Sequence, residues 1–229
     1  MMRPLLLGIL FCTNFTLVLA QDSTHFLLHI VPTFQGEDLV LNKNYYYQND
    51  SIRFETLKFY IGNIFLSGEN EQNSCFENNY FLIDAENPAS YHIELPCLSS
   101  QQYQQIGFTV GVDSLTNVSG VMGGNLDPTK GMYWTWQSGY INVKLEGYTN
   151  ICPARKHFFQ FHLGGYLPPN ACMQMLVFPL KVASMATIYL PIEQFLENIS
   201  LTDTYQIMET CEEAVILSKQ FADSFSIDK

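Results

Sequence analysis

The chain has 229 residues, with 22 acidic side chains against 11 lysines and arginines, and its formal net charge is −11 when the five histidines are counted as neutral. This charge repels a phosphate backbone, so it argues against nucleic acids and anionic membrane surfaces as partners and suits a cation or a basic protein better. The length is enough for one sandwich-type domain with a substantial core.

Residues 1–20 have the pattern of a secretory signal peptide. Arg3 precedes an apolar run that ends in Val18-Leu19-Ala20, the small-residue pattern of a cleavage site. The run is interrupted by polar residues and is too short to span a bilayer, and no later stretch is apolar for long enough. We therefore expect residues 21–229 to form a single exported domain, periplasmic or secreted, with no membrane span.

Short strand-like runs separated by turn signals follow the leader. They cover residues 25–31, 51–66, 80–85, 105–112, 140–148, 157–164, 174–180 and 187–192, with Gly, Pro and Asn clusters between them. This spacing is typical of an all-β sandwich or barrel. Two later stretches look helical: a turn of helix over 191–198, and a strand followed by a short amphipathic helix within 203–222.

Both tryptophans of the chain, Trp134 and Trp136, lie one residue apart in a strand-like segment. Residues two apart in a strand point to the same face, so the two indoles are expected to form one aromatic surface. That surface is either a core wall, since buried aromatics carry a large apolar area, or a binding site.

Of the six cysteines, all but Cys12 lie beyond the leader, which leaves an odd number for an oxidising compartment. Two disulfides and one spare thiol are the plainest interpretation. The pairs Cys75 with Cys97 and Cys152 with Cys172 each bracket an expected hairpin and are predicted to be bonded, although sequence alone does not prove this connectivity. Cys211 is then the spare thiol.

Five histidines are candidate metal ligands: His25, His29, His92, His157 and His162. His25 and His29 are four residues apart and share a face of their strand. Alternation puts His157 and His162 on opposite faces, so a regular strand does not aim both at one ion. His92 is expected at the surface.

Oxygen-bearing side chains gather in the glycine-containing stretch 113–127, namely Asp113, Asn117, Asn125 and Asp127. Such loops can hold calcium, which is a further candidate cofactor, but this spacing matches no standard calcium loop. The alternative is turn chemistry, in which Asp and Asn bond their own backbone.

Motifs for nucleophilic, phosphate or dinucleotide chemistry are absent from the sequence. Asp84 and Glu86, within LIDAENP, resemble a strand end that enters a turn rather than a pair of catalytic acids. We therefore expect a protein that is not an enzyme.

A series of segments, in order along the chain, is similar to the MbnP-like family, which takes its name from a protein of the methanobactin operon. The segments are FYIGNIFL, LIDAENPAS, IGFTVGVDSLTNVSG, GNLDPTKGMYWTWQSGYINVKLEG and FQFHLGGY. The similarity runs from about His29 to Phe225. It implies an exported antiparallel β-sandwich, here with a short C-terminal helical segment, that binds copper.

The resemblance also implies a site. Relatives in methanotrophic bacteria hold one copper ion with histidines and a tryptophan oxidised to kynurenine, and a di-haem enzyme of the MbnH/MauG type performs the oxidation. Trp134 or Trp136 would be the oxidised residue. His162, in the best-matched segment, and His29, at the start of the match, are the preferred ligands, because imidazole suits copper in either oxidation state.

A non-catalytic recognition module is the alternative function. In that case Trp134 and Trp136 stack on a sugar or a peptide and no metal is bound. An exposed indole pair favours recognition, whereas a buried pair within reach of His162 or His29 favours copper.

Overall fold

The computed structural model describes residues 23–68, 74–98, 103–136, 139–181 and 184–227. The expected signal peptide lies outside these residues. Among the described residues, none of the helices has the length and apolarity that a membrane crossing needs.

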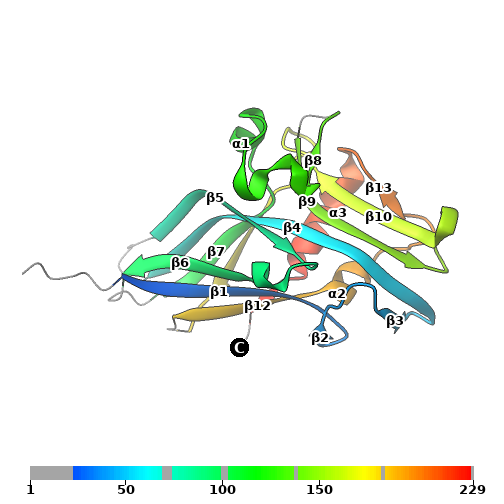
Figure 1. Cartoon of the computed structure of the whole chain (residues 1–229), viewed down its shortest axis with the longest axis horizontal. Coiled ribbons are helices and arrows are strands. Elements are labelled where there is room, and N and C mark those ends of the chain that lie inside the picture. Colours follow the sequence, from blue (N-terminus) through cyan, green and yellow to red (C-terminus); the bar gives the residue numbers. More distant parts are fainter. Residues whose placement is uncertain (1–22, 69–73, 99–102, 137–138, 182–183, 228–229) are drawn as a thin grey trace, which may run out of the picture.

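Two mixed β-sheets make up most of the fold (Figure 1). The smaller sheet has the order β14-β12-β1-β2, with β6 also paired to β1, and the larger has the order β11-β7-β4-β9-β10-β13, with β3 and β5 paired to β4 and β8 paired to β9. The strands are β1 (Ser23–Phe34), β2 (Glu37–Asp38), β3 (Asn44–Tyr47), β4 (Asp50–Gly68), β5 (Ser74–Asp84), β6 (His92–Leu98), β7 (Tyr103–Val110), β8 (Tyr133–Trp134), β9 (Gly139–Thr149), β10 (Phe158–Gly164), β11 (Gln174–Pro179), β12 (Met185–Pro191), β13 (Gln206–Ile207) and β14 (Ser226–Ile227).

The predicted all-β class is confirmed, with the qualification that each sheet contains one parallel pairing. β1 runs parallel to β12, and β10 runs parallel to β13. The other strand pairs are antiparallel, including all those made by β4. The sandwich is therefore mixed rather than purely antiparallel.

Short helices connect and cover the sheets. They are the 3-10 turns η1 (Pro88–Tyr91), η2 (Gly124–Leu126), η3 (Pro128–Lys130) and η4 (Arg155–His157), and the α-helices α1 (Ser114–Val118), α2 (Ile192–Leu196) and α3 (Glu212–Asp223). The helical expectations for 191–198 and 203–222 are confirmed by α2, and by β13 followed by α3. Glu212 and Glu213 lie in the first turn of α3, where negative charge favours the helix dipole.

The main core lies between the two sheets and is closed by α3. Alternation on β1 buries Phe26, Leu28 and Ile30, and alternation on β10 buries Phe159, Phe161 and Leu163. On α3, Phe221 makes edge contacts with Phe59 of β4 and Phe195 of α2, at centroid distances of 5.4 and 5.3 Å. These aromatic contacts fix the helix against the sheets.

The predicted disulfide between Cys152 and Cys172 is wrong. Both are buried free thiols, and they donate to carbonyls at opposite ends of β10: Cys152 Sγ to Phe158 O at 3.4 Å and Cys172 Sγ to Gly164 O at 3.2 Å. A strand rises about 3.3 Å per residue, so these carbonyls are separated by roughly 20 Å, far beyond disulfide reach. The side chains of Cys75 and Cys97 lie outside the described residues, and that pairing stays a prediction.

Thiol accessibility tests this correction. In the folded protein, a negatively charged alkylating reagent should leave Cys152 and Cys172 unlabelled, because both are buried and burial raises the pKa of the Cys172 thiol to about 11. In denaturant without reductant, Cys152, Cys172 and the partly exposed Cys211 should all be labelled. Mass spectrometry of the peptides reads the result, and a peptide linking Cys152 to Cys172 would contradict the structure.

Candidate functional site

Residues 111–136, which follow β7, fold over the outer face of the larger sheet as a cap. It contains α1, η2, η3 and β8, which lie together above β4, β5 and β9 (Figure 1). A second apolar cluster, separate from the main core, lies under the cap. Its buried members are Tyr60, Tyr80, Leu82, Val112, Leu126, Met132, Trp134, Tyr140 and Ile141.

Two polar side chains, the half-buried Asp113 and the buried Asn117, attach the start of this cap to the sheet. Asp113 is the N-cap of α1 and accepts from Thr116 N at 2.7 Å, while its other oxygen accepts from the Tyr80 hydroxyl. Asn117 donates to Val112 O at 3.0 Å and accepts from Tyr140 N at 2.8 Å. The cap is therefore positioned by directional bonds as well as by apolar packing.

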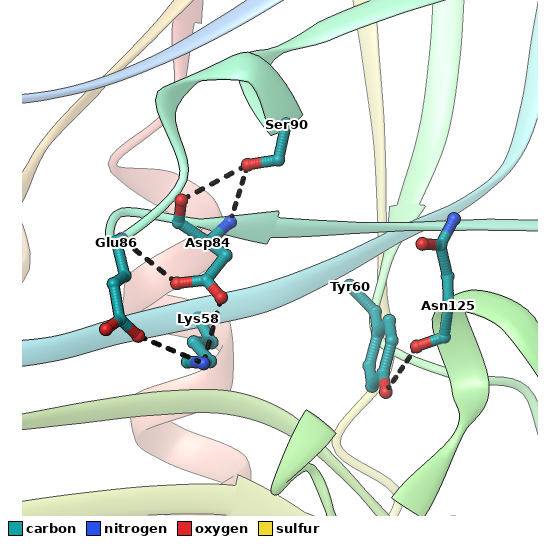
Figure 2. A network of polar contacts seen from close by, with 6 residues as sticks. All are labelled: Lys58, Tyr60, Asp84, Glu86, Ser90 and Asn125. Carbon is teal, nitrogen blue, oxygen red and sulfur yellow. Dashed lines mark hydrogen bonds and ion pairs between the residues drawn. The ribbon is translucent and has the colours of Figure 1, made fainter. Parts of the chain in front are cut away.

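The other oxygen-bearing residues of the stretch also bond the protein itself. The side-chain amide of Asn125 donates to Tyr80 O at 2.8 Å. The backbone carbonyl of Asn125 accepts from the Tyr60 hydroxyl at 3.1 Å (Figure 2). Asp127 caps η3 by accepting from Thr129 N at 2.8 Å. These are the bonds of turn chemistry.

Asp84 and Glu86 close a turn, as their sequence context predicts. Asp84 forms an ion pair with Lys58 at 2.8 Å and accepts from the backbone N–H of Glu86 at 3.0 Å, and Ser90 bonds the Asp84 backbone (Figure 2). Glu86 lies 3.9 Å from the same lysine. The carboxylates thus share a cation at the end of β5.

The two tryptophans occupy different environments. Trp134 is 5% exposed and Trp136 is 63% exposed, although their ring centroids are only 5.8 Å apart. The expected strand geometry is wrong, because β8 ends at Trp134 and alternation does not continue to Trp136, but the two rings still contact each other. The two contacting rings therefore extend from the buried interior of the cap to the protein surface.

Trp134 packs directly on a glycine of β10. A Cβ on Gly164 would lie 2.8 Å from Trp134 Cζ3 and 2.7 Å from Tyr140 O, so only glycine allows this approach. The buried indole Nε1 of Trp134 finds no hydrogen-bond partner among the described residues. A buried donor without a partner is costly, and a specific instance calls for an explanation.

His162 lies two residues before Gly164 on β10, and the pairing of β10 with β9 shifts register between Leu163 and Gly164. His162 is 6% exposed, and its Nε2 lies 2.7 Å from Glu146 Oε1 on the neighbouring strand β9. Burial alone would raise the pKa of Glu146, but hydrogen bonds from His162 and Thr56 and the nearby Lys144 charge outweigh it and lower that pKa. Glu146 is thus an anion that orients the imidazole.

His29 lies elsewhere. It points away from the core on β1 of the smaller sheet, between the buried Leu28 and Ile30, and its ring stacks on His92 of β6. Burial, followed by the proximity of His92, lowers the pKa of His29 against an opposing contribution from Asp38. His29 and His162 therefore lie on outer faces of different sheets and do not share a site.

The sequence did not predict two side-chain contacts: that of Glu146 with His162, and that of His92 with His29. Each is fixed by the register between strands, which residue patterns do not reveal. His92 is exposed, as predicted. Within the described ranges, no group of three or more His, Cys, Asp or Glu side chains is arranged to hold a metal ion.

The close packing of Trp134 on Gly164 can be tested by substitution. Gly164→Ala should displace the indole and lower the free energy of unfolding by about 1–3 kcal/mol, as overpacking does. The Trp134 emission should shift to longer wavelength as the ring meets water. Gly123→Ala is the matched control, because a Cβ there meets nothing within 4 Å. Equal stability and emission in the two variants would refute the contact.

The role of Glu146 can be tested through pH. Its pKa is lower in the folded chain than its ordinary 4.5, so the carboxylate adds stability above pH 4.5, and this contribution is lost as pH falls through the folded pKa. Wild type should therefore be more stable than Glu146→Gln at neutral pH, and the difference should shrink below pH 4.5. The exposed Glu94→Gln variant should show a much smaller difference from wild type across this range. Denaturant unfolding at several pH values measures the free energy of unfolding of wild type and both variants.

Comparison with known proteins is consistent with this architecture. None of the curated proteins compared matches the chain. The solved structure of MbnP from Methylosinus trichosporium is similar in fold, with a TM-score of 0.60 at 12% sequence identity over 79% of this chain and 80% of that one. The MbnP family model matches residues 23–212. The chain therefore belongs to the MbnP family.

Proposed function

We propose that this protein is an exported copper-binding member of its family, and that Trp134 is the residue a di-haem enzyme of the MbnH/MauG type oxidises to kynurenine. The observation that carries the proposal is the buried indole N–H of Trp134, which has no partner among the described residues, in a ring that packs against Gly164, two residues from His162 on β10. A structural tryptophan would be expected to satisfy this donor.

The chemistry of the neighbouring residues fits a copper ligand set once Trp134 is modified. A ligating histidine commonly donates its other ring N–H to a carboxylate, which is the arrangement of His162 with Glu146 at 2.7 Å. If Nε2 carries that proton, Nδ1 retains a lone pair for the metal. Copper bound here would supply a redox-active cation that imidazole holds in either oxidation state.

Trp134 itself has to change before it contributes a ligand. An indole offers only an N–H donor, whereas kynurenine carries an aniline nitrogen and a ketone oxygen. In the proposed oxidation, two molecules of hydrogen peroxide used by the haem enzyme deliver one oxygen atom each to C2 and C3 of the indole. The bond between these carbons breaks and two waters leave. Hydrolysis of the N-formyl group then consumes one water and releases formic acid.

Trp136 is the surface residue through which the oxidising partner would approach. It is exposed, and its ring lies 5.8 Å from that of Trp134. The strongly acidic chain suits a partner with a basic docking surface. Trp136 is therefore assigned to partner contact, and His29, on the other sheet, is not assigned to this site.

Recognition of a ligand by Trp136 is the rival function, and one observation favours it. Trp136 lines a pocket of about 630 Å³. The other lining residues are Tyr205, Gln206 and Met208, together with the acidic Asp203 and Glu209. Aromatic faces with nearby carboxylates suit a cationic group of a peptide, and an exposed indole also stacks on a sugar. No copper or kynurenine is needed for such binding.

Mass spectrometry of protein from its native host, or co-expressed with its di-haem enzyme, separates the two functions. The peptide with both tryptophans should gain about 4 Da at Trp134, the difference between tryptophan and kynurenine. Trp134→Phe should remove both the gain and the copper held beside Trp134, and in Trp136→Phe any gain should lie at Trp134. Two unmodified tryptophans without copper would overturn the proposal and favour recognition.

A further inference from the structure

A pair of stacked histidines lies on the outer face of the smaller sheet, away from the Trp134 site. His29 on β1 and His92 on β6 are directly opposed in the antiparallel register. Their ring centroids are 4.1 Å apart and the ring planes differ by 13°. Both side chains point away from the core, because their strand neighbours Leu28, Ile30 and Ile93 are buried.

We propose that His29 and His92 form a second metal site, which chelates a divalent first-row transition-metal cation from solvent. Imidazole nitrogens are favoured ligands for this class, and by the Irving–Williams order Cu²⁺ should bind most tightly. The two residues contribute one ring nitrogen each, and water completes the coordination. Metal–nitrogen bonds of about 2.0–2.1 Å require the stacked rings to turn so that both lone pairs face one ion.

The backbone supplies the preorganisation that such a pair needs. Directly opposed residues of antiparallel strands have Cβ atoms about 4.5–5.5 Å apart, so both side chains start within reach of one ion. β1 is held on its other side by β12, where Thr187 is the partner of His29. The strand positions are thus fixed before binding, and only the side chains have to adjust.

The electrostatic surroundings favour a cation at this pair. Glu94 is exposed on the same face of β6 as His92, two residues along the strand. Asp38 of β2 is close enough to influence His29 electrostatically. Neither carboxylate completes a cluster of three metal ligands with the pair, so the proposed site is an open one with two protein ligands. The net charge of the chain adds a long-range attraction.

This site is independent of any change at Trp134. The pair sits on the smaller sheet and Trp134 on the larger, so unmodified protein carries the complete histidine pair. Binding can therefore be measured on chain 21–229 produced without an oxidising enzyme, with both tryptophans verified by mass. If His29 and His92 bind no metal, the proposed function is unaffected. If no kynurenine forms at Trp134, the proposal for the histidine pair is unaffected.

Titration with Cu²⁺, followed by calorimetry and electron paramagnetic resonance, tests the proposal. Wild type should show one site whose spectrum carries couplings from two imidazole nitrogens. His29→Asn and His92→Asn should each weaken that site at least about tenfold and remove one nitrogen coupling. Zn²⁺, as a second probe, should compete for the same site with lower affinity.

His25→Asn is the matched control, because His25 shares the outward face of β1 but is paired with Pro96 rather than with a histidine. The His25→Asn variant should bind Cu²⁺ at the pair of His29 and His92 as wild type does. The His162→Asn variant should do the same. Circular dichroism melting verifies folding, and the exposed His92 keeps the test valid if His29→Asn unfolds. Unchanged binding in His92→Asn, or an equal loss in His25→Asn, would overturn the proposal.

Discussion

The need to bury both faces of β4 organises the molecule. This strand runs from Asp50 to Gly68 and pairs with β3, β5, β7 and β9. Phe59 and Ile61 point into the core between the sheets, while Tyr60, between them in sequence, belongs to the second apolar cluster. A strand that is apolar on both faces has to be covered on both, and here the smaller sheet covers one face and the cap covers the other.

The cap contains the described part of the family segment, residues 131–136, with both tryptophans. Because the cap has its own small core, Trp134 is buried outside the main core. Its ring nevertheless contacts Trp136, which is exposed to solvent. The same arrangement places Trp134 against Gly164, whose strand carries His162. Trp134 is thus held firmly while its neighbour Trp136 remains accessible, a combination that the sandwich core alone does not provide.

Residue patterns predicted the positions of the strands better than the side-chain contacts between strands. Strand-like runs between turn signals located the longer strands, namely β1, β4, β5, β7, β9, β10, β11 and β12. β6 was not predicted, because Pro96 interrupts its strand pattern. The disulfide prediction failed because Cys152 and Cys172 do bracket a strand, β10, but lie at its two ends. The pairs His162 with Glu146 and His29 with His92 depend on register, which no local pattern encodes.

The smaller sheet also constrains the order in which the chain can fold. β1, at the start of the described chain, pairs with β12, and β12 in turn pairs with β14, so Leu27 meets Met185 and Ile188 meets Ile227. Such distant pairings carry a large loop-closure entropy and form late. β1 can pair early with β6, but its other edge stays open until the C-terminal strands are available. Until β12 pairs with it, this edge of β1 keeps its backbone N–H and C=O groups unpaired, so the partly folded chain exposes an edge that can pair with another chain.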